Sequence, residues 1–179
     1  MPPFRFLLCF LLVACVSMGC SRVPRYRTLP PSVRTISVPM FVNRTAEPQI
    51  EEDATRFTQE EFLADGRLDL VRQGEADAIV RVTLRDFIDR GATFDADDFP
   101  SSREFTIIAD VEIVRNVPEQ PLIGGRRTVS ATTFFNNETR SADFVPEPRG
   151  MDQALRTLAQ RIVWEVLTGA YETEATDPG

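Results

Sequence analysis

Apolar and polar residues along the chain separate into three kinds of segment. Residues 6–16 form an almost unbroken apolar run (FLLCFLLVACV), residues 21–32 have no hydrophobic periodicity, and later segments alternate at the period of strands or helices. The apolar run is shorter than the ~20 residues that cross a bilayer as a helix. Because Arg5 precedes it and small residues follow it, the run has the layout of a removable secretory signal peptide.

The predicted signal peptide covers residues 1–19 and is followed by a cysteine. The stretch VSMGC at 16–20 resembles a bacterial lipobox, in which a small residue precedes a cysteine that receives diacylglycerol. We therefore expect Cys20 to carry the lipid. An alternative is Cys15, because LVAC at 12–15 fits the lipobox better at its first position but leaves a short signal. Ser21 in place of an Asp resembles lipoproteins of the outer membrane, so we expect a lipid-anchored protein on its periplasmic face.

Three segments are expected in the mature chain. Residues 20–32 contain three Pro and three Arg without periodicity, which predicts a lipidated N-terminus and an extended tether. Residues 33–169 are expected to form one folded domain of ordinary size. The acidic residues 170–179 have no periodicity, and we expect a disordered tail there.

The first half of the domain predicts a strand, a helix and a short strand. In residues 33–41, Ile36, Val38 and Met40 alternate with polar residues, and Pro39 predicts a bulge or a sheet edge. A helix is predicted over 50–64 and ends at Asp65-Gly66, with a short strand at 67–71. The predicted buried face of the helix consists of Ile50, Ala54, Phe57 and Ala64.

The second half predicts three long strands and a final helix. Residues 77–90 and 105–115 read as a hairpin around an acid-rich loop at 91–102, and 126–135 as a third strand. Along 77–90 one face carries Ala78, Val80, Val82, Leu84 and Ile88, and the other carries Arg81, Thr83, Arg85 and Asp89. The helix over 151–167 buries Met151, Leu155, Leu158, Ile162 and Val166, with Trp164 at its flank.

This order of elements predicts an α+β fold. We expect a two-layer sandwich in which two helices pack on one face of a mainly antiparallel sheet of four to five strands. The other face of the sheet is polar enough to contact water or a partner.

Composition excludes several classes of function. The net charge of −7 argues against nucleic-acid binding, and the absence of His removes the commonest general base and metal ligand. All three cysteines lie in the first 20 residues, so we expect no disulfide, metal or cofactor in the domain. An enzyme would depend on carboxylates such as Asp95, Asp97 and Asp98, but their spacing fits no calcium loop. We therefore expect a non-enzymatic protein without catalytic residues.

Four segments resemble the LptE family of outer-membrane lipoproteins. They are TISVPMFVNRTAEP at 35–48, EEFLADGRLDLV at 60–71, EADAIVRVTLRDF at 75–87 and ALRTLAQRIVWEVL at 154–167. The resemblance implies a protein that sits inside the LptD β-barrel, helps it to fold and assists delivery of lipopolysaccharide (LPS) to the outer leaflet. Family members contact LPS through basic side chains, for which strand phase offers Arg81, Arg85, Arg126 and Arg127 as candidates. For each of these arginines we favour the interpretation as part of an ordinary solvated sheet face.

A second lipoprotein class shares the opening pattern of strand, Asn-containing turn, helix and hairpin. LpoB, CsgG and TolB-like domains resemble the chain in this respect, and they would imply an activator or scaffold of another envelope complex. The long helix after the last strand fits the LptE family better.

Overall fold

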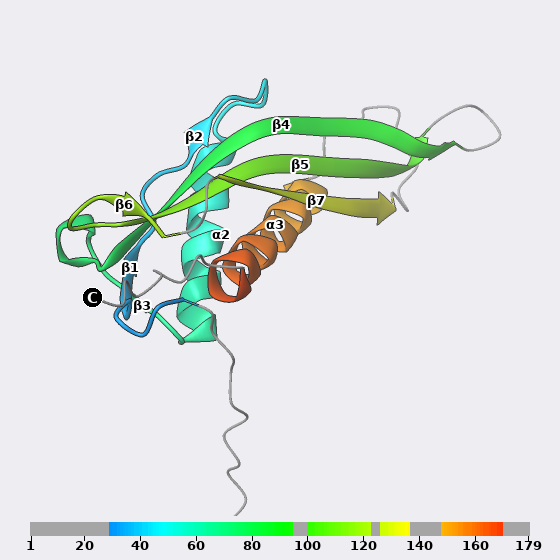
Figure 1. Cartoon of the computed structure of the whole chain (residues 1–179). Coiled ribbons are helices and arrows are strands. Elements are labelled where there is room, and N and C mark those ends of the chain that lie inside the picture. The colour runs from blue at the N-terminus through cyan, green and yellow to red at the C-terminus, as the bar shows by residue number, and fades with distance from the viewer. Residues whose placement is uncertain (1–28, 95–99, 123–125, 137–147, 170–179) are drawn as a thin grey trace, which may run out of the picture.

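The folded part of the chain has two layers, a twisted sheet and two helices that cover one of its faces (Figure 1). The computed structural model describes residues 29–94, 100–122, 126–136 and 148–169. The helices are α2, Ile50–Asp65, and α3, Pro148–Thr168. The predicted α+β two-layer fold is confirmed.

Seven strands form one sheet within the described residues, in the order β3-β1-β4-β5-β6, with β2 beside β4 and β7 beside β5. Their bounds are Thr35–Ser37 (β1), Val42–Asn43 (β2), Asp69–Leu70 (β3), Ala78–Phe94 (β4), Pro100–Arg115 (β5), Gln120–Pro121 (β6) and Arg127–Asn136 (β7), with a 3₁₀ turn, η1, at Gln73–Glu75. The pairs that involve β5 are antiparallel, whereas β1 and β2 run parallel to β4. The sheet is thus mixed, because the chain returns through α2 between β2 and β3.

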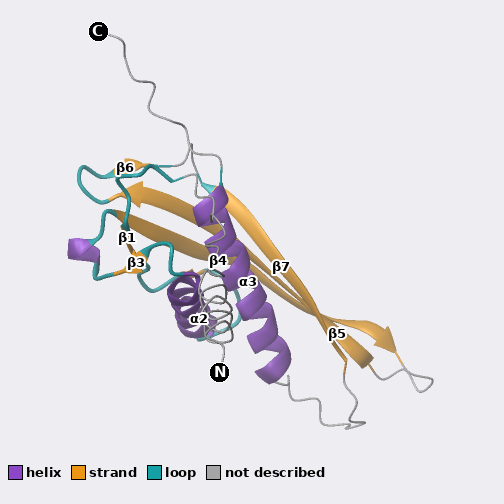
Figure 2. Cartoon of the chain, turned by 90° about the horizontal axis from the view of Figure 1, so that it is seen from below, coloured by secondary structure: helices purple, strands orange, loops and turns teal. Residues whose placement is uncertain are grey.

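Strands β4 and β5 form a long hairpin that extends beyond the helices (Figures 1 and 2). The predicted loop over 91–102 is shorter than expected, because β4 continues to Phe94 and β5 begins at Pro100. The hairpin continues as a ribbon because each strand supplies the hydrogen-bond partners of the other.

A β-bulge at Arg85 changes which residues of β4 face the helices. The register shift after Leu84 leaves Arg85 without a partner residue on β5. Since side chains alternate along a strand, one extra residue exchanges the two faces. Phe87 therefore points toward the core and stacks on Phe105, with ring centroids 6.2 Å apart. The prediction that Ile88 points inward is wrong.

The first predicted strand is divided in two at Pro39. β1 ends at Ser37 and β2 begins at Val42, as expected for a residue without an N–H group. Met40, predicted to be buried, is 60% exposed, and Phe41 occupies the core position instead.

Side chains of α2 bond the backbone of this gap. The Phe41 N–H donates to Thr55 Oγ1 at 3.0 Å, and Gln59 Nε2 donates to the Val38 carbonyl at 2.9 Å. Buried backbone groups require such partners. The divided edge strand is therefore held against the helix.

Both helices bury an apolar stripe in one continuous core. α2 ends at Asp65 and is capped by Gly66, whose φ of 68° is costly for other residues and whose N–H donates to the Phe62 carbonyl. Of its predicted buried face only Ala64 is exposed, and Phe62 is buried instead. In α3 the predicted apolar stripe is buried, with Met151 partly covered.

The core begins before the predicted start of the domain. Leu29, inside the segment interpreted as a tether, is only 3% exposed and belongs to the core cluster. The signal peptide, Cys20, residues 170–179 and the loop acids at 95, 97 and 98 lie outside the described residues.

Candidate functional site

The face of the sheet that the helices leave open carries most of the candidate arginines. Its outward positions on β4, β5 and β7 include Arg81, Thr83, Arg85, Asp110, Glu112, Thr128, Ser130 and Thr132. Side chains in a strand alternate, so these residues lie opposite the core positions. We call this surface the open face.

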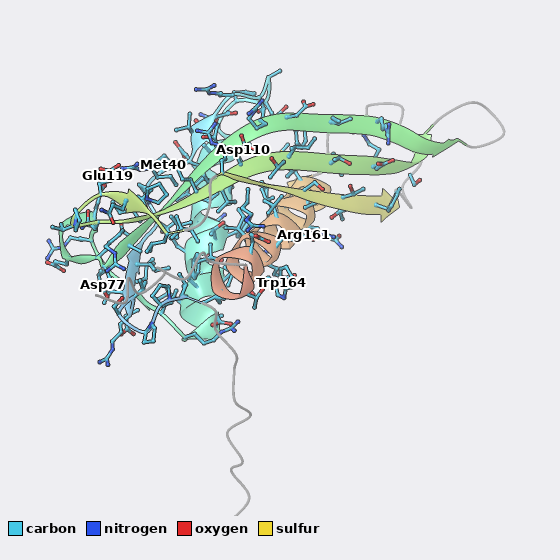
Figure 3. All side chains as sticks on the ribbon, viewed as in Figure 1. Met40, Asp77, Asp110, Glu119, Arg161 and Trp164 are labelled. Carbon is cyan, nitrogen blue, oxygen red and sulfur yellow. The ribbon has the colours of Figure 1, made fainter. Side chains whose placement is uncertain are left out.

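Asp110, labelled in Figure 3, is the centre of a hydrogen-bonded cluster on the open face. Its side chain is 5% exposed and accepts from Arg85 Nη1 at 2.7 Å and from Thr128 Oγ1 at 2.8 Å, while Arg126 Nη1 lies 3.9 Å away. Burial alone would raise the pKa of Asp110. The hydrogen bonds from Thr128 and Arg85, with the charges of Arg85 and Arg126, outweigh burial and lower this pKa below its usual value.

Two guanidinium groups therefore share one buried carboxylate, which sequence reasoning did not single out. Arg85 and Arg126 are each more than half exposed. A guanidinium has five N–H donors, so both retain donors for a further ligand. Arg85, Arg126 and Asp110 together carry one net positive charge, which suits an anionic group such as phosphate.

Arg81 is also on the open face but is paired elsewhere. Its Nη1 lies 2.7 Å from Glu119 Oε1, in the loop before β6. The hydrogen bond from Arg81 and its charge lower the pKa of Glu119. The side chains of Arg81 and Glu119 are 41% and 59% exposed, so the ion pair is weak and solvent-screened.

Arg127 points to the other side of the sheet. Arg127 lies opposite Val111, a core residue of the neighbouring strand β5, and its Nε lies 3.6 Å from Glu165 Oε1 on α3. The four candidate arginines therefore do not form one patch, because Arg127 belongs to the helical side.

The distal hairpin carries two further ion pairs that the sequence did not reveal. Arg90 bonds Glu104 with both Nε and Nη2, which lowers the pKa of Glu104, and Arg103 bonds Asp89. The bulge places Asp89 on the helical side rather than the predicted outer face. The ribbon thus has charged pairs on both faces.

Helix α3 exposes two large side chains next to β7. Trp164 is 63% exposed, and Arg161, one turn before it, is exposed and has no ion pair within the described part of the chain. Figure 3 shows both on the side of α3 that lies below β7. Sequence periodicity places Trp164 at the helix flank but indicates nothing about its neighbours.

Other features of the described residues offer little chemistry. A shallow hollow of about 550 Å³ is lined by Ser37, Val38, Gln59, Leu70, Val71, Arg72 and Glu75, but Gln59 bonds Val38 and Arg72 pairs with Glu75. No cluster of three metal-ligating side chains occurs in the described ranges. Nor is any helix there long and apolar enough to span a membrane.

Solved structures share this fold at low sequence identity. A dodecamer of a PelC variant from Paraburkholderia phytofirmans is 12% identical, with a TM-score of 0.52 over 80% of this chain and 96% of that one. A hypothetical protein from Chlamydia trachomatis is 9% identical, with a TM-score of 0.53 over 74% and 95%. A minor lipoprotein from Acinetobacter baumannii is 12% identical, with a TM-score of 0.50 over 76% and 92%. These likenesses establish the fold alone.

Sequence comparison with families is more specific. No curated protein is detectably similar to the chain in a direct sequence comparison. The family model described as "LptE: Lipopolysaccharide-assembly" matches residues 33–168, which include both helices and all seven strands of the sheet. The match covers well over half of the chain, so this protein belongs to the LptE family of lipopolysaccharide assembly.

Proposed function

We propose that the protein is a non-enzymatic outer-membrane lipoprotein that sits in an LptD-type β-barrel, helps the barrel to assemble and assists LPS delivery to the outer leaflet. The observation that carries this proposal is the family match across the whole folded domain. The sequence supports it, because a predicted signal peptide and a lipobox-like VSMGC precede the domain and no His is available for catalysis.

The lipid anchor is proposed at Cys20, on the periplasmic face of the outer membrane. The buried Leu29 follows Cys20 by nine positions, which is at most about 30 Å of extended chain. The domain would therefore stay close to the membrane surface. Mass spectrometry of the mature protein tests this site: Cys20→Ala should abolish the diacylglyceryl mass increment and Cys15→Ala should leave it, whereas the reverse result would assign Cys15.

Contact with LPS is proposed at the cluster of Asp110, Arg85 and Arg126. Its buried carboxylate holds the partly exposed Arg85 guanidinium by a 2.7 Å hydrogen bond and lies 3.9 Å from that of Arg126, and an oriented guanidinium binds phosphate well. Arg85→Gln should weaken binding of purified LPS about tenfold, as expected for the loss of one charge-assisted contact. Arg81→Gln, which removes a cation paired with Glu119, is the matched control.

Copurification tests the partner. A tagged chain is purified from outer membranes of its own organism, and the proteins recovered with it are quantified. An LptD barrel at near-equal amount supports the proposal. Its absence, with a synthase or another periplasmic complex recovered instead, would favour an LpoB, CsgG or TolB-like activator.

A further inference from the structure

Within the described residues, one edge of strand β7 is unpaired. It pairs with β5 over ten residues, and no described strand lies along its other side. After Arg127 its sequence, TVSATTFFN, contains no charged residue and no Pro. Soluble proteins usually protect a sheet edge with short strands, charges or Pro, because a long uncharged edge pairs readily with another chain. The composition of β7 therefore suits pairing with a further strand.

Helix α3 runs along β7 on the helical side of the sheet (Figure 2), and two pairs of side chains connect them. Thr133 and Thr157 approach to 3.5 Å near one end, and Arg127 and Glu165 to 3.6 Å near the other. Arg161 lies midway between Thr157 and Glu165 at four-residue spacing, so it shares their side of the helix. The spacing therefore places Arg161 on the part of α3 that lies beside the middle of β7.

Trp164 extends this surface on the same exposed side of α3. A tryptophan that is 63% exposed presents a large apolar area, and such residues are enriched at the centres of protein interfaces. We call the surface formed by the backbone of β7 together with Arg161 and Trp164 the edge site.

The positive charge of Arg161 distinguishes two candidate occupants of the edge site, a second copy of this chain and a different protein. In an isologous dimer β7 would pair with β7 of a second copy about a two-fold axis near its middle. The two copies of Arg161 would then face each other across the axis, which is unfavourable for like charges. A different chain with a carboxylate at this point would instead pair with Arg161.

We propose that the edge site binds an extended segment of a partner protein, which adds to the sheet as a strand beside β7, places a carboxylate against Arg161 and an apolar side chain against Trp164. Main-chain hydrogen bonds supply affinity in this mode, and the flanking side chains supply specificity. This inference rests on the proposed function, because we assign the extended segment to the barrel partner.

The test compares the free chain with its complex with the LptD barrel of the same organism. Amide hydrogen exchange is measured on peptides that cover residues 127–136. We expect amides on the free edge to exchange at least about tenfold more slowly in the complex. Arg161→Glu should lower the amount of barrel recovered about tenfold. Arg44→Glu is the matched control, because Arg44 is also exposed without a described ion pair and lies at the opposite edge, beside β2.

Each other outcome overturns the inference. If the barrel is recovered equally with both variants and β7 exchange is unchanged, the proposed function stands and the edge site falls. If the wild-type chain recovers no barrel, both fall. If the isolated chain already protects β7, then either sedimentation shows a dimer that pairs two copies, or deletion of residues 170–179 restores exchange and identifies an internal occupant.

Discussion

Asp110 is a charged residue with a side chain that is only 5% exposed, and its carboxylate accepts hydrogen bonds from Thr128 and Arg85. Sequence alternation places Asp110 on the polar face of its strand but does not reveal its burial, which depends on the side chains of β4 and β7 that cover it. Such a cluster is visible only in three dimensions.

Asp110→Asn should destabilise the fold. The amide keeps the shape but loses the charge, so Arg85 and Arg126 are left close together without their shared anion. Charge-assisted hydrogen bonds of this kind contribute about 1.5–3 kcal/mol each, and we expect urea unfolding to show a loss of about 2 kcal/mol. Asp86→Asn, on an exposed position of the same strand pair, should change stability by less than about 0.5 kcal/mol. Equal effects of the two substitutions would argue against the cluster.

Asp77 gives the protein an acid-sensitive contact. The N–H groups of Arg34 and Thr35 donate to its Oδ2 at 2.8 and 2.9 Å, and these hydrogen bonds lower the pKa of Asp77. A carboxyl whose pKa falls on folding stabilises the native state above its unfolded pKa of about 4, and this contribution is lost as the pH falls through the lower folded pKa. Asp77→Asn should therefore lower the free energy of unfolding at pH 7 and reduce its further loss below about pH 4. An unchanged pH profile would show that the contact has no such role.

Among the elements, the helices and the long hairpin follow from periodicity, but the parallel pairs of β1 and β2 and the faces of β4 after Leu84 do not. α2 begins at the predicted residue and α3 keeps its predicted stripe, because an amphipathic helix is specified by residues close in sequence. The bulge at Arg85 depends on how β4 aligns with β5. Arg85 and Asp86 are consecutive polar residues that interrupt the alternation, and this interruption is the local sequence signal of the bulge.

The bulge makes a prediction about neighbouring residues of β4. Phe87→Ala should cost about 2 kcal/mol, because the ring stacks on Phe105 and packs against the core. Ile88→Ala should cost about 1 kcal/mol or less, because Ile88 lies on the open face. Chemical denaturation of the two variants compares them directly. If Ile88→Ala cost more stability than Phe87→Ala, Ile88 would be the buried residue, and this result would contradict the register shift.

At the scale of the whole molecule, the domain begins earlier than its periodicity indicates. Leu29 is a single apolar residue among Pro and Arg, so no local pattern marks it as core. A chain that begins at Val33 should be about 2 kcal/mol less stable than one that begins at Leu29, because a buried leucine is lost. Thermal unfolding of both chains measures the difference. Equal stability would show that Leu29 is dispensable and that residues 29–32 act as a tether.

The order of residues along the chain was enough to predict the two-layer fold class, the two helices, the long hairpin and the family resemblance, because each depends on residues that are close together or on motifs in a fixed order. The folded structure was needed to find the parallel edge formed by β1 and β2, the faces of β4 after Leu84 and the separation of Arg127 from the other candidate arginines. These features depend on strand register and on side chains from distant segments. Contacts between segments that are distant in the sequence stabilise these features, and local periodicity contains no information about such contacts.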